Sequence, residues 1–375
     1  MKQEVISFYN EFKCLGGDCR MSCCKGWHIA IDDETLKVHM TGKKRSLFIK
    51  TLPGGQKVIR KCFNNCPYHT SSGLCKFQLQ DKEEYMPKIC RIYPRRSLKF
   101  NTSVEACMEL SCMEAARIFL SHPDRPKLIP YTDGTLPYLW EVDNDDPEFL
   151  NFLEQSRDIL MDFIWTGDVS SVDDITAKMH AIYRYVFPMH KLLMEDKQAE
   201  ATKLLKETPD KYADSDKALP VFFFPVTMLN DLIFNEIYYP GMIVKNPVLF
   251  KLIRSYRRLF GKIWERDAED HFKKALLDMV SERPHLIRKY RAYLSYSLFI
   301  TFKEAYEDYY LIGPMLLSFI YTSFLMLFDM VSFHSNNRKL TEEDEIFILS
   351  SVEKALRHSV DVSDSFLKKI RKEFL

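Results

Sequence analysis

Glycine is scarce in this 375-residue chain, and its 12 glycines are spaced so that no Gly-x-Gly sequence occurs. The dinucleotide-binding fingerprint and the phosphate-binding loop both need closely spaced glycines, so neither is present. The zinc-protease motif His-Glu-x-x-His and the hydrolase motif Gly-x-Ser-x-Gly are absent as well. These absences exclude the most common nucleotide-binding and hydrolytic sites.

Cysteine is missing from the last 263 residues, because all ten cysteines lie between residues 14 and 112. Such clustering is typical of disulfides, a redox relay or soft-metal ligation. The N-terminal residues lack the apolar segment of a secretory signal, so we expect a cytoplasmic protein with reduced thiols. Thiolates select zinc or iron–sulfur clusters, and no spacing matches a repeated Cys-x2-Cys zinc ribbon. The sequence therefore predicts an irregular metal site built from loops.

The net charge of +1 argues against binding nucleic acid or a membrane surface, but the charge is unevenly distributed. Residues 1–120 have a net charge of +8 and the remainder a net charge of −7. Residues 121–148 are rich in Pro and Asp and are typical of a linker. We predict a cysteine-rich metal- or cluster-binding domain at 1–120, a linker at 121–148 and a substrate-binding helical domain at 149–375.

The predicted fold class is mainly α, with an irregular cysteine-rich domain followed by an all-α domain. Apolar residues recur at helical spacing after residue 148, which indicates seven to nine helices and little strand. The predicted helical ranges are 149–163, 172–206, 226–238, 246–281, 284–310, 314–332, 340–357 and 361–373. Short helices are also expected at 32–40 and from 112 to 120, and a loop or hairpin at 41–60. The uncharged run Tyr309–Phe328 has the length of a membrane span, but its polar residues and acidic flanks favour a buried helix.

Five segments carry a resemblance to a known family. Residues 22–32 read Ser-Cys-Cys-Lys-Gly-Trp-His-Ile-Ala-Ile-Asp, and residues 66–68 read Cys-Pro-Tyr. Leu-Cys follows at 74–75, Cys-Arg-Ile-Tyr-Pro-Arg at 90–95, and Leu-Ser-Cys-Met-Glu-Ala-Ala-Arg at 110–117. Over about residues 5–120 the chain resembles the flagellin lysine N-methylases, with Met113 in place of the usual proline. This region is also similar to small zinc- or iron-chelating domains.

The resemblance implies that methyl groups pass from S-adenosylmethionine to lysine ε-amines of flagellin in the cytoplasm, before the flagellin is exported. It also implies a 4Fe-4S cluster, although the Cys-x3-Cys-x2-Cys motif of radical adenosylmethionine enzymes is absent. A cluster with one iron free of thiolate would offer a place for the amino and carboxylate groups of the methyl donor. The eight cysteines that match the family are predicted metal ligands: Cys14, Cys19, Cys23, Cys24, Cys66, Cys75, Cys90 and Cys112. Cys62 and Cys107 fall outside the match and are expected to be non-ligands.

Further roles are hypotheses attached to this resemblance. Tyr93 would orient the reacting groups, and Asp32 or Glu114 would accept the proton of the lysine amine. Arg91 and Arg95 would bind the carboxylate of adenosylmethionine, with Trp27 as a stacking surface. In a purely structural alternative, Arg91 and Arg95 form ion pairs with Asp32 and Glu114, and Trp27 belongs to the core.

A second functional class stays open at this point. With eight matched cysteines the chain has enough ligands for one cluster plus one zinc, or for two zinc sites. The protein would then be a zinc-stapled module that binds flagellin or another protein without catalysing a reaction.

Overall fold

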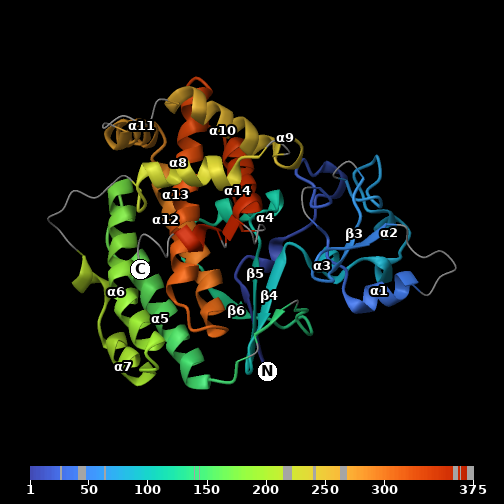
Figure 1. Cartoon of the computed structure of the whole chain (residues 1–375), viewed down its shortest axis with the longest axis horizontal. Helices are drawn as coiled ribbons and strands as arrows, with labels where there is room; N and C mark the ends of the chain where they lie inside the picture. Colours follow the sequence, from blue (N-terminus) through green and yellow to red (C-terminus); the bar gives the residue numbers. More distant parts are fainter. Residues whose placement is uncertain are drawn as a thin grey trace.

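The computed structural model describes residues 1–25, 28–40, 48–62, 65–138, 140–142, 144–213, 222–239, 242–261, 268–357, 362–363 and 365–369. Helices from the C-terminal two thirds of the chain fill one side of the molecule (Figure 1). The loops that carry most of the cysteines, here called the cysteine lobe (residues 14–92), lie on the other side, and strands β4 and β5 lie between the two parts.

A five-stranded sheet joins the cysteine lobe to the helices. Its order is β6-β1-β5-β4-β7, and the central strand β5 has all six residues buried. The β5 strand runs parallel to β1 and antiparallel to β4, with Ala106 between Val5 and Ser97. The strands are β1 (Lys2–Ile6), β4 (Arg95–Lys99), β5 (Ser103–Met108), β6 (Leu128–Pro130) and β7 (Trp140–Glu141).

The sequence does not predict this sheet. Its central strand includes Glu105, a residue type that is disfavoured in a buried strand unless a partner neutralises it. Those partners are Arg157 and Lys303, which approach from far along the chain. Periodicity along a single segment therefore gave no sign of a buried strand here.

The cysteine lobe has short elements with loops between them, as expected for an irregular cysteine-rich region. Strands β2 (Ile49–Thr51) and β3 (Lys57–Ile59) form an antiparallel hairpin, which confirms the hairpin expected within 41–60. Helix α1 (Asp33–Met40) begins after Asp32, as predicted, since the Asp32 carboxylate accepts the backbone N–H of Thr35 at 3.0 Å. The other α-helices of the cysteine lobe are α2 (Lys76–Leu79) and α3 (Lys88–Ile92), whereas α4 (Met113–Ser121) lies against α14 among the helices (Figure 1).

Ten α-helices follow residue 146 in the described part of the chain, which confirms the predicted mainly α character. Their number exceeds the expected seven to nine because the predicted ranges 172–206 and 246–281 each contain two helices, and a further short helix at 242–245 lies outside every predicted range. The helices are α5 (Pro147–Trp165), α6 (Val172–Met194), α7 (Gln198–Lys203), α8 (Val226–Leu232), α9 (Met242–Lys245), α10 (Pro247–Phe260), α11 (Ala268–Glu282), α12 (His285–Thr301), α13 (Ile312–Ser335) and α14 (Glu342–Leu356). A π-helical turn, η6 (Ile233–Ile237), extends α8, and a 3-10 turn, η7 (Phe302–Tyr306), extends α12.

Side-chain caps explain where several of these helices begin. At the start of α6, Ser171 and Asp174 satisfy each other's backbone N–H groups, and Thr341 and Asp344 do the same for α14. Pro147 occupies the first turn of α5 without losing a helical hydrogen bond. In the predicted helical range 361–373, the described residues 362–363 and 365–369 are helical, and the other residues of that range lie outside the described part of the chain.

Helix α13 contains most of the uncharged run noted in the sequence. Among the described residues it is the one helix that is long and apolar enough to cross a membrane by length and composition, with a mean hydropathy of 1.7. In its most apolar window 89% of the residues are buried inside the protein, by contacts that include α6, α10, α11, α12 and α14. The helix thus occupies the interior position that the sequence favours.

One hydrophobic core extends from the sheet through the helices and includes residues from Val5 to Phe366. Tyr296 of α12 connects the two parts, because its hydroxyl donates to the Met108 carbonyl at 2.7 Å and accepts the Met108 N–H at 2.9 Å. A second, small core around Ile29, Ile31 and Ile59 stabilises the cysteine lobe. Strands β6 and β7 come from residues 121–148, and the predicted division into two domains and a linker stays a prediction.

Candidate functional site

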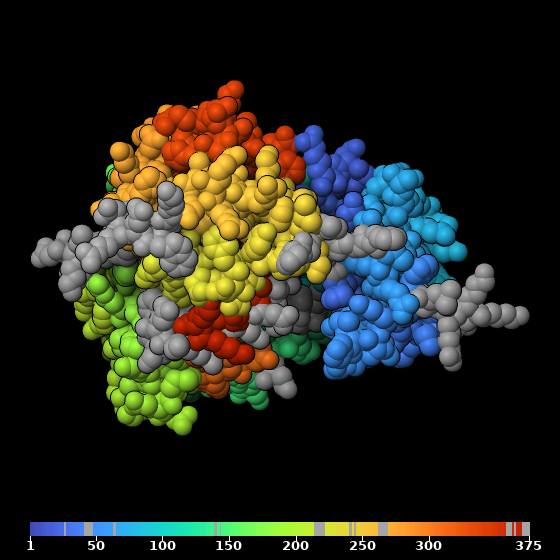
Figure 2. Space-filling view, turned by 45° about the horizontal axis from the view of Figure 1, so that its top comes forward, coloured from blue at the N-terminus to red at the C-terminus, as the bar shows by residue number. Residues whose placement is uncertain are grey.

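A cavity of about 990 Å³ lies between the cysteine lobe and the helices. Its lining includes all eight cysteines that carry the family resemblance: Cys14, Cys19, Cys23, Cys24, Cys66, Cys75, Cys90 and Cys112. Cys62 and Cys107, which were expected to be non-ligands, are not part of this lining. Figure 2 shows the N-terminal segments, coloured blue to cyan, beside helices coloured yellow to red. The fold thus brings one set of thiols, scattered over a hundred residues, to one cavity.

Four of these cysteines form a first group around the small core of the cysteine lobe: Cys24, Cys66, Cys75 and Cys90. The Cys66 N–H donates to the Cys24 carbonyl at 3.1 Å, and Cys24 and Cys90 pack against the same apolar side chains as Cys66. Burial raises the pKa of the Cys66 thiol to about 11. Burial also raises the pKa of Cys90, and the neighbouring Cys24, Cys66 and Cys75 thiolates raise it further. These four sulfur atoms are therefore close enough to affect one another's charge.

A second group consists of Cys14, Cys19 and Cys112. Burial raises the pKa of the Cys112 thiol to about 12, hydrogen bonds from Ala115 and Glu114 oppose this shift, and the charges of Cys19 and Cys14 add to it. Cys112 precedes the first residue of α4, so its position is fixed by the start of that helix. Cys19 also experiences the charge of Lys354 from α14. This second group therefore lies on the side of the cavity nearer the helices.

Cys23 links the two groups. Its hydrogen bond with Cys24 and its removal from water raise the pKa of Cys23 well above its ordinary value, with contributions from the charges of Cys24, Cys90 and Cys112. The same hydrogen bond lowers the pKa of Cys24, which also lies near the cations of His69 and Lys61.

Glycine allows the two cysteine loops to approach closely. A Cβ atom on Gly17 would lie 2.4 Å from the Ser72 carbonyl oxygen, and one on Gly73 would lie 2.8 Å from Gly17 Cα. Only a residue without a side chain fits at such contacts. The loop between Cys14 and Cys19 is therefore held against the loop that precedes Cys75.

The donor set fits a thiolate-ligated cluster. All ten cysteines are free thiols, which argues against the disulfide alternative. Within the described part of the chain, no three His, Cys, Asp or Glu side chains converge closely enough to hold a single metal ion. Four thiolates on one zinc would stand about 3.8 Å apart, from Zn–S bonds of about 2.3 Å in a tetrahedron. Thiolates around a four-iron cluster stand farther apart because each binds a different iron atom, and the eight cysteines of the cavity are numerous enough for either arrangement.

Tyr93 lines the cavity and follows the last residue of α3. Its hydroxyl is 3.0 Å from Ser111 Oγ, which fixes the direction of the ring. Burial raises the pKa of Tyr93 well above its ordinary value, and the charges of Cys112 and Cys23 raise it further. The phenol therefore stays protonated at neutral pH and is suited to donate a hydrogen bond.

Arg91 and Arg95 both line the cavity as well. The Arg95 guanidinium stacks on Tyr9 and Phe12, with 5.2 and 5.1 Å to the ring centroids. Within the described part of the chain neither arginine forms an ion pair, so the structural alternative that paired them with Asp32 and Glu114 is wrong. That alternative failed because both carboxylates have nearer partners.

The two predicted proton acceptors differ in position. Asp32 does not line the cavity, and its carboxylate caps α1 and accepts the Lys88 N–H at 2.6 Å. Burial raises the pKa of Asp32, but these hydrogen bonds outweigh it and keep the pKa below its ordinary value. Glu114 lines the cavity and pairs with Arg117 at 2.6 Å. Trp27 lies outside the described residues.

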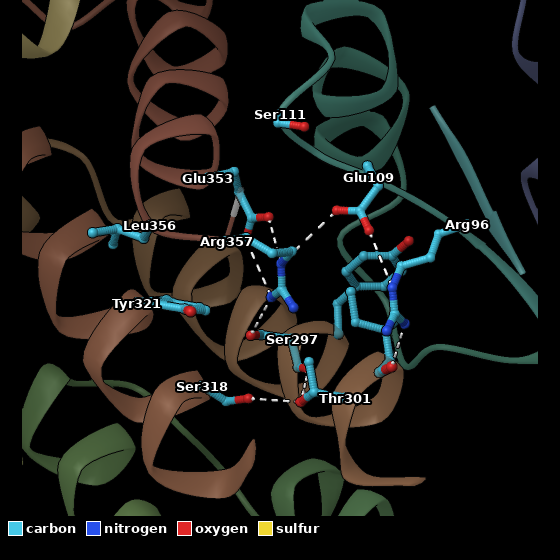
Figure 3. A network of polar contacts seen from close by, with 12 residues as sticks. Arg96, Glu109, Ser111, Ser297, Thr301, Ser318, Tyr321, Glu353, Leu356 and Arg357 are labelled. Atoms are coloured by element: carbon cyan, nitrogen blue, oxygen red, sulfur yellow. Dashed lines mark hydrogen bonds and ion pairs between the residues drawn. The ribbon is translucent and has the colours of Figure 1, made fainter. Parts of the chain in front are cut away.

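Sequence patterns missed a polar network at the helical end of the cavity (Figure 3). Arg96 Nε is 3.2 Å from Glu109 Oε1, and Arg96 also pairs with Glu304. Arg357 lies 2.8 Å from Glu353 and 4.0 Å from the second oxygen of Glu109. These residues come from β4, the loop after β5, η7 and the end of α14. Nothing in their local sequence distinguishes them from charged surface residues, apart from Arg96 and Glu109 flanking matched motifs.

Comparisons with known proteins agree with the cysteine motifs. A lysine-N-methylase of Salmonella typhimurium is 28% identical over 140 residues, which make up 33% of this chain and 34% of the relative. A lysine-N-methylase of Salmonella choleraesuis matches equally well. The chain is similar to lysine-N-methylases. The resemblance that the motifs indicate is therefore confirmed.

A shorter relative, the flagellar biosynthetic protein FliU of Salmonella muenchen, is also 28% identical over 140 residues, which cover 82% of its length. The matches thus span about a third of this chain and a third of the two lysine-N-methylases. No family model and no solved structure matches the chain.

Proposed function

We propose that this protein is a lysine N-methyltransferase that transfers methyl groups from S-adenosylmethionine to flagellin, with an iron–sulfur cluster held by its cysteines. The observation that carries the proposal is the convergence of the eight motif cysteines on one cavity, which also contains Tyr93, Arg91 and Arg95. The names of the Salmonella relatives supply the reaction and the flagellar substrate. Methylation would take place in the cytoplasm, before export of flagellin.

The two groups of thiols would have different tasks. Cys24, Cys66 and Cys90 pack in the small core and Cys75 lies near Cys90, and together they would form a structural site that holds the lobe together. Cys23 and Cys112 lie near Tyr93 and, together with one of Cys14 and Cys19, would hold the cluster that takes part in the reaction through three thiolates. When bound, a cluster with an open iron supplies a Lewis-acidic position for the amino and carboxylate groups of the methyl donor.

Arg91 and Arg95 would orient the donor. A guanidinium binds a carboxylate through two parallel hydrogen bonds, which fixes both the position and the angle of the ligand. The rings of Tyr9 and Phe12 hold the Arg95 guanidinium in place before any ligand arrives. Such preorganisation places the sulfonium methyl group where an incoming amine can attack it. Trp27 remains the proposed stacking surface for the donor.

The lysine amine must be neutral when it attacks. Glu114 lines the cavity and would accept the proton of the lysine ammonium, whereas Asp32 serves as a helix cap away from the cavity. The positive charge of the nearby donor lowers the pKa of the lysine and so makes this transfer easier. Tyr93, which keeps its own proton, would donate a hydrogen bond that orients the reacting groups.

The experiment is an anaerobic purification, followed by measurement of iron, sulfide and zinc and by a methyl-transfer assay with labelled adenosylmethionine and purified flagellin. Cys23→Ala and Cys112→Ala are expected to lose at least half of the iron and more than 95% of the activity. Cys62→Ala is the matched control, because Cys62 is an exposed thiol outside the cavity. This variant should keep its iron content and its methyl-transfer activity.

Iron and sulfide in equal amounts, together with label in flagellin, would support the proposal. Zinc without iron, and no label in flagellin, would contradict it and favour the zinc-stapled binding module. Full activity of Cys112→Ala would contradict the assignment of the second thiol group.

A further inference from the structure

The helical end of the cavity has a different lining from the cysteine end. Its walls are formed by Thr301, Glu304, Leu317, Tyr321, Arg357 and Leu367, from α12, η7, α13, α14 and the segment after α14. Tyr321 and Thr301 are nearly fully buried, and Thr301 Oγ1 is 3.2 Å from Ser318 Oγ. None of these residues belongs to the motifs that carry the family resemblance. This end of the cavity has no part in the metal site described above.

The charged residues at this end have a net charge of −1. Arg96 and Arg357 contribute two positive charges, whereas Glu109, Glu304 and Glu353 contribute three negative ones. Burial lowers the pKa of Arg357, but the charges of Glu353 and Glu109 outweigh it and keep the guanidinium protonated. The four buried charges of this group cancel, so its net negative charge comes from the more exposed Glu304 and favours a cationic ligand beside that carboxylate.

Glu304 is the carboxylate of this group that a ligand can reach. Its side chain is 39% exposed, whereas those of Glu109 and Glu353 are 8% and 1% exposed. Glu304 lies on the short turn η7 directly after α12, and Arg96 holds its carboxylate from one side. Glu109 also lines the cavity and adds negative charge, but it pairs with Arg96 and its side chain is much less exposed than that of Glu304.

The apolar wall defines the shape of the ligand. Leu317, Tyr321 and Leu367 add hydrocarbon and an aromatic ring to the cavity lining, and the Arg357 guanidinium lies 5.2 Å from the centroid of the Tyr321 ring. The Tyr321 hydroxyl is 3.2 Å from Ser363 Oγ, so the polar end of the ring already has a neighbour. An unbranched alkyl chain that ends in an ammonium group matches both the wall and the charge.

We infer that the helical end of the cavity binds the side chain of the lysine to be methylated, with Glu304 holding its ε-ammonium group. This inference rests on the proposed methylation of lysine. The methyl donor is also a cation, but its adenine, ribose and carboxylate groups need polar partners. Arg91 and Arg95 near the cysteines offer such partners, whereas the wall of Leu317, Tyr321 and Leu367 does not. Amine and donor would thus enter the cavity from opposite ends and meet beside Tyr93.

The test measures equilibrium binding of n-hexylammonium and of n-hexanol to the anaerobically purified full-length protein by titration calorimetry. Hexylammonium should bind the unmodified protein at least tenfold more tightly than hexanol. Glu304→Gln should weaken hexylammonium binding about tenfold and leave hexanol binding unchanged. Glu141→Gln is the matched control, because Glu141 is a paired surface carboxylate outside the cavity lining. This variant should change neither the affinity for hexylammonium nor the affinity for hexanol.

A second variant has the opposite predicted sign. Arg96→Gln removes the cation that competes for Glu304 and should tighten hexylammonium binding, an effect that partial unfolding does not produce. Thermal unfolding followed by circular dichroism checks that each variant is folded. Equal hexylammonium binding by the unmodified protein and Glu304→Gln would overturn the inference. So would a loss of adenosylmethionine binding in Glu304→Gln with hexylammonium binding intact, because the site would then belong to the donor.

The methyl-transfer assay separates this inference from the proposed function. If Glu304→Gln raises the KM for flagellin about tenfold with kcat reduced less than threefold, both hold. If hexylammonium binding depends on Glu304 but no methyl transfer is found, the ammonium site stands and the methylase proposal fails. If methyl transfer is found but neither binding nor KM depends on Glu304, the methylase proposal stands and the lysine site fails.

Discussion

Replacing Glu105 by Gln should destabilise the protein by about 3 kcal/mol, because Glu105 joins the sheet to two helices through buried charges. Its carboxylate is 2.7 Å from both Arg157 of α5 and Lys303 of η7, and the three side chains are 8%, 2% and 9% exposed for Arg157, Lys303 and Glu105. In Glu105→Gln, Lys303 would keep Glu154, a more exposed partner, and Arg157 would keep the charge of Asp158 without a direct ion pair to Glu105. Loss of one partner of a buried pair typically costs about 3–5 kcal/mol.

The pKa of Glu105 gives a second measure of the same effect. Burial by itself raises this pKa, but the charges of Arg157 and Lys303 outweigh burial and hold it at about 2, against an ordinary value of 4.5. At about 1.4 kcal/mol per pKa unit, this difference corresponds to about 3 kcal/mol of extra stability for the ionised form. The two routes therefore give the same magnitude.

The pH dependence of this contribution has a definite sign. Folding lowers the pKa of Glu105, so the ionised carboxylate stabilises the folded protein fully when the pH is above about 4.5, the pKa in the unfolded chain. This stabilisation disappears as the pH falls toward 2. Urea unfolding followed by circular dichroism should show the full difference between wild type and Glu105→Gln at pH 7. The difference should shrink steadily below pH 4.5.

Glu141→Gln is the control for this measurement. Glu141 pairs with Lys99 on the surface, where an ion pair contributes about 0–1 kcal/mol. The electrostatic argument would be refuted if the free energy of unfolding of Glu105→Gln were within 1 kcal/mol of the wild-type value at pH 7. It would also be refuted if the difference between the two free energies did not depend on pH.

Two further predictions concern the donor and the start of α14. Arg91→Gln and Arg95→Gln should each raise the KM for adenosylmethionine about tenfold, as expected for about 1.4 kcal/mol from one charged hydrogen bond, with little change in the KM for flagellin. Arg125→Gln, which removes a surface pair with Asp162, is the control, and an unchanged donor KM in both variants would contradict the assignment. Thr341→Ala should lower stability to urea by about 1 kcal/mol because it removes the cap of α14, whereas Thr341→Ser should keep it. An Ala variant as stable as the Ser variant would show that the capping box does not stabilise this helix.

The sequence predicts what is local and misses what depends on partners far along the chain. The starts of α5, α6 and α14 follow from Asp, Ser and Thr caps next to apolar periodicity, so their positions could be predicted. The convergence of the cysteines could be predicted only as a group, since no spacing rule says that Cys24 neighbours Cys66, Cys75 and Cys90. The sheet could not be predicted, because the charge of Glu105 hides a buried strand until Arg157 and Lys303 are in place.

The polar end of the cavity shows the same limit for function. Arg96 and Glu304 are about two hundred residues apart, and each is an ordinary charged residue in its own segment. They can act together in the cavity because the fold places Glu304 of η7 opposite β4, which contains Arg96. A resemblance carried by cysteine motifs therefore identifies the cysteine half of the candidate site, whereas the half proposed to bind the substrate lysine is found only from the structure.

The position of the cavity between the two parts of the protein has a mechanistic consequence. Methyl transfer needs a cationic donor and an amine that is cationic until it loses its proton, and two cations in one low-dielectric space repel each other strongly. Under the proposed function, separate counter-charges at the two ends would reduce this cost: cysteines that become thiolates when they bind a cluster lie at one end, and the net negative group around Glu304 lies at the other. Neither part alone provides both counter-charges. The buried contacts of Tyr296 with Met108 and of Lys303 with Glu105 hold the two ends at a fixed separation, so a mutation that loosens them should impair methyl transfer without touching a ligand.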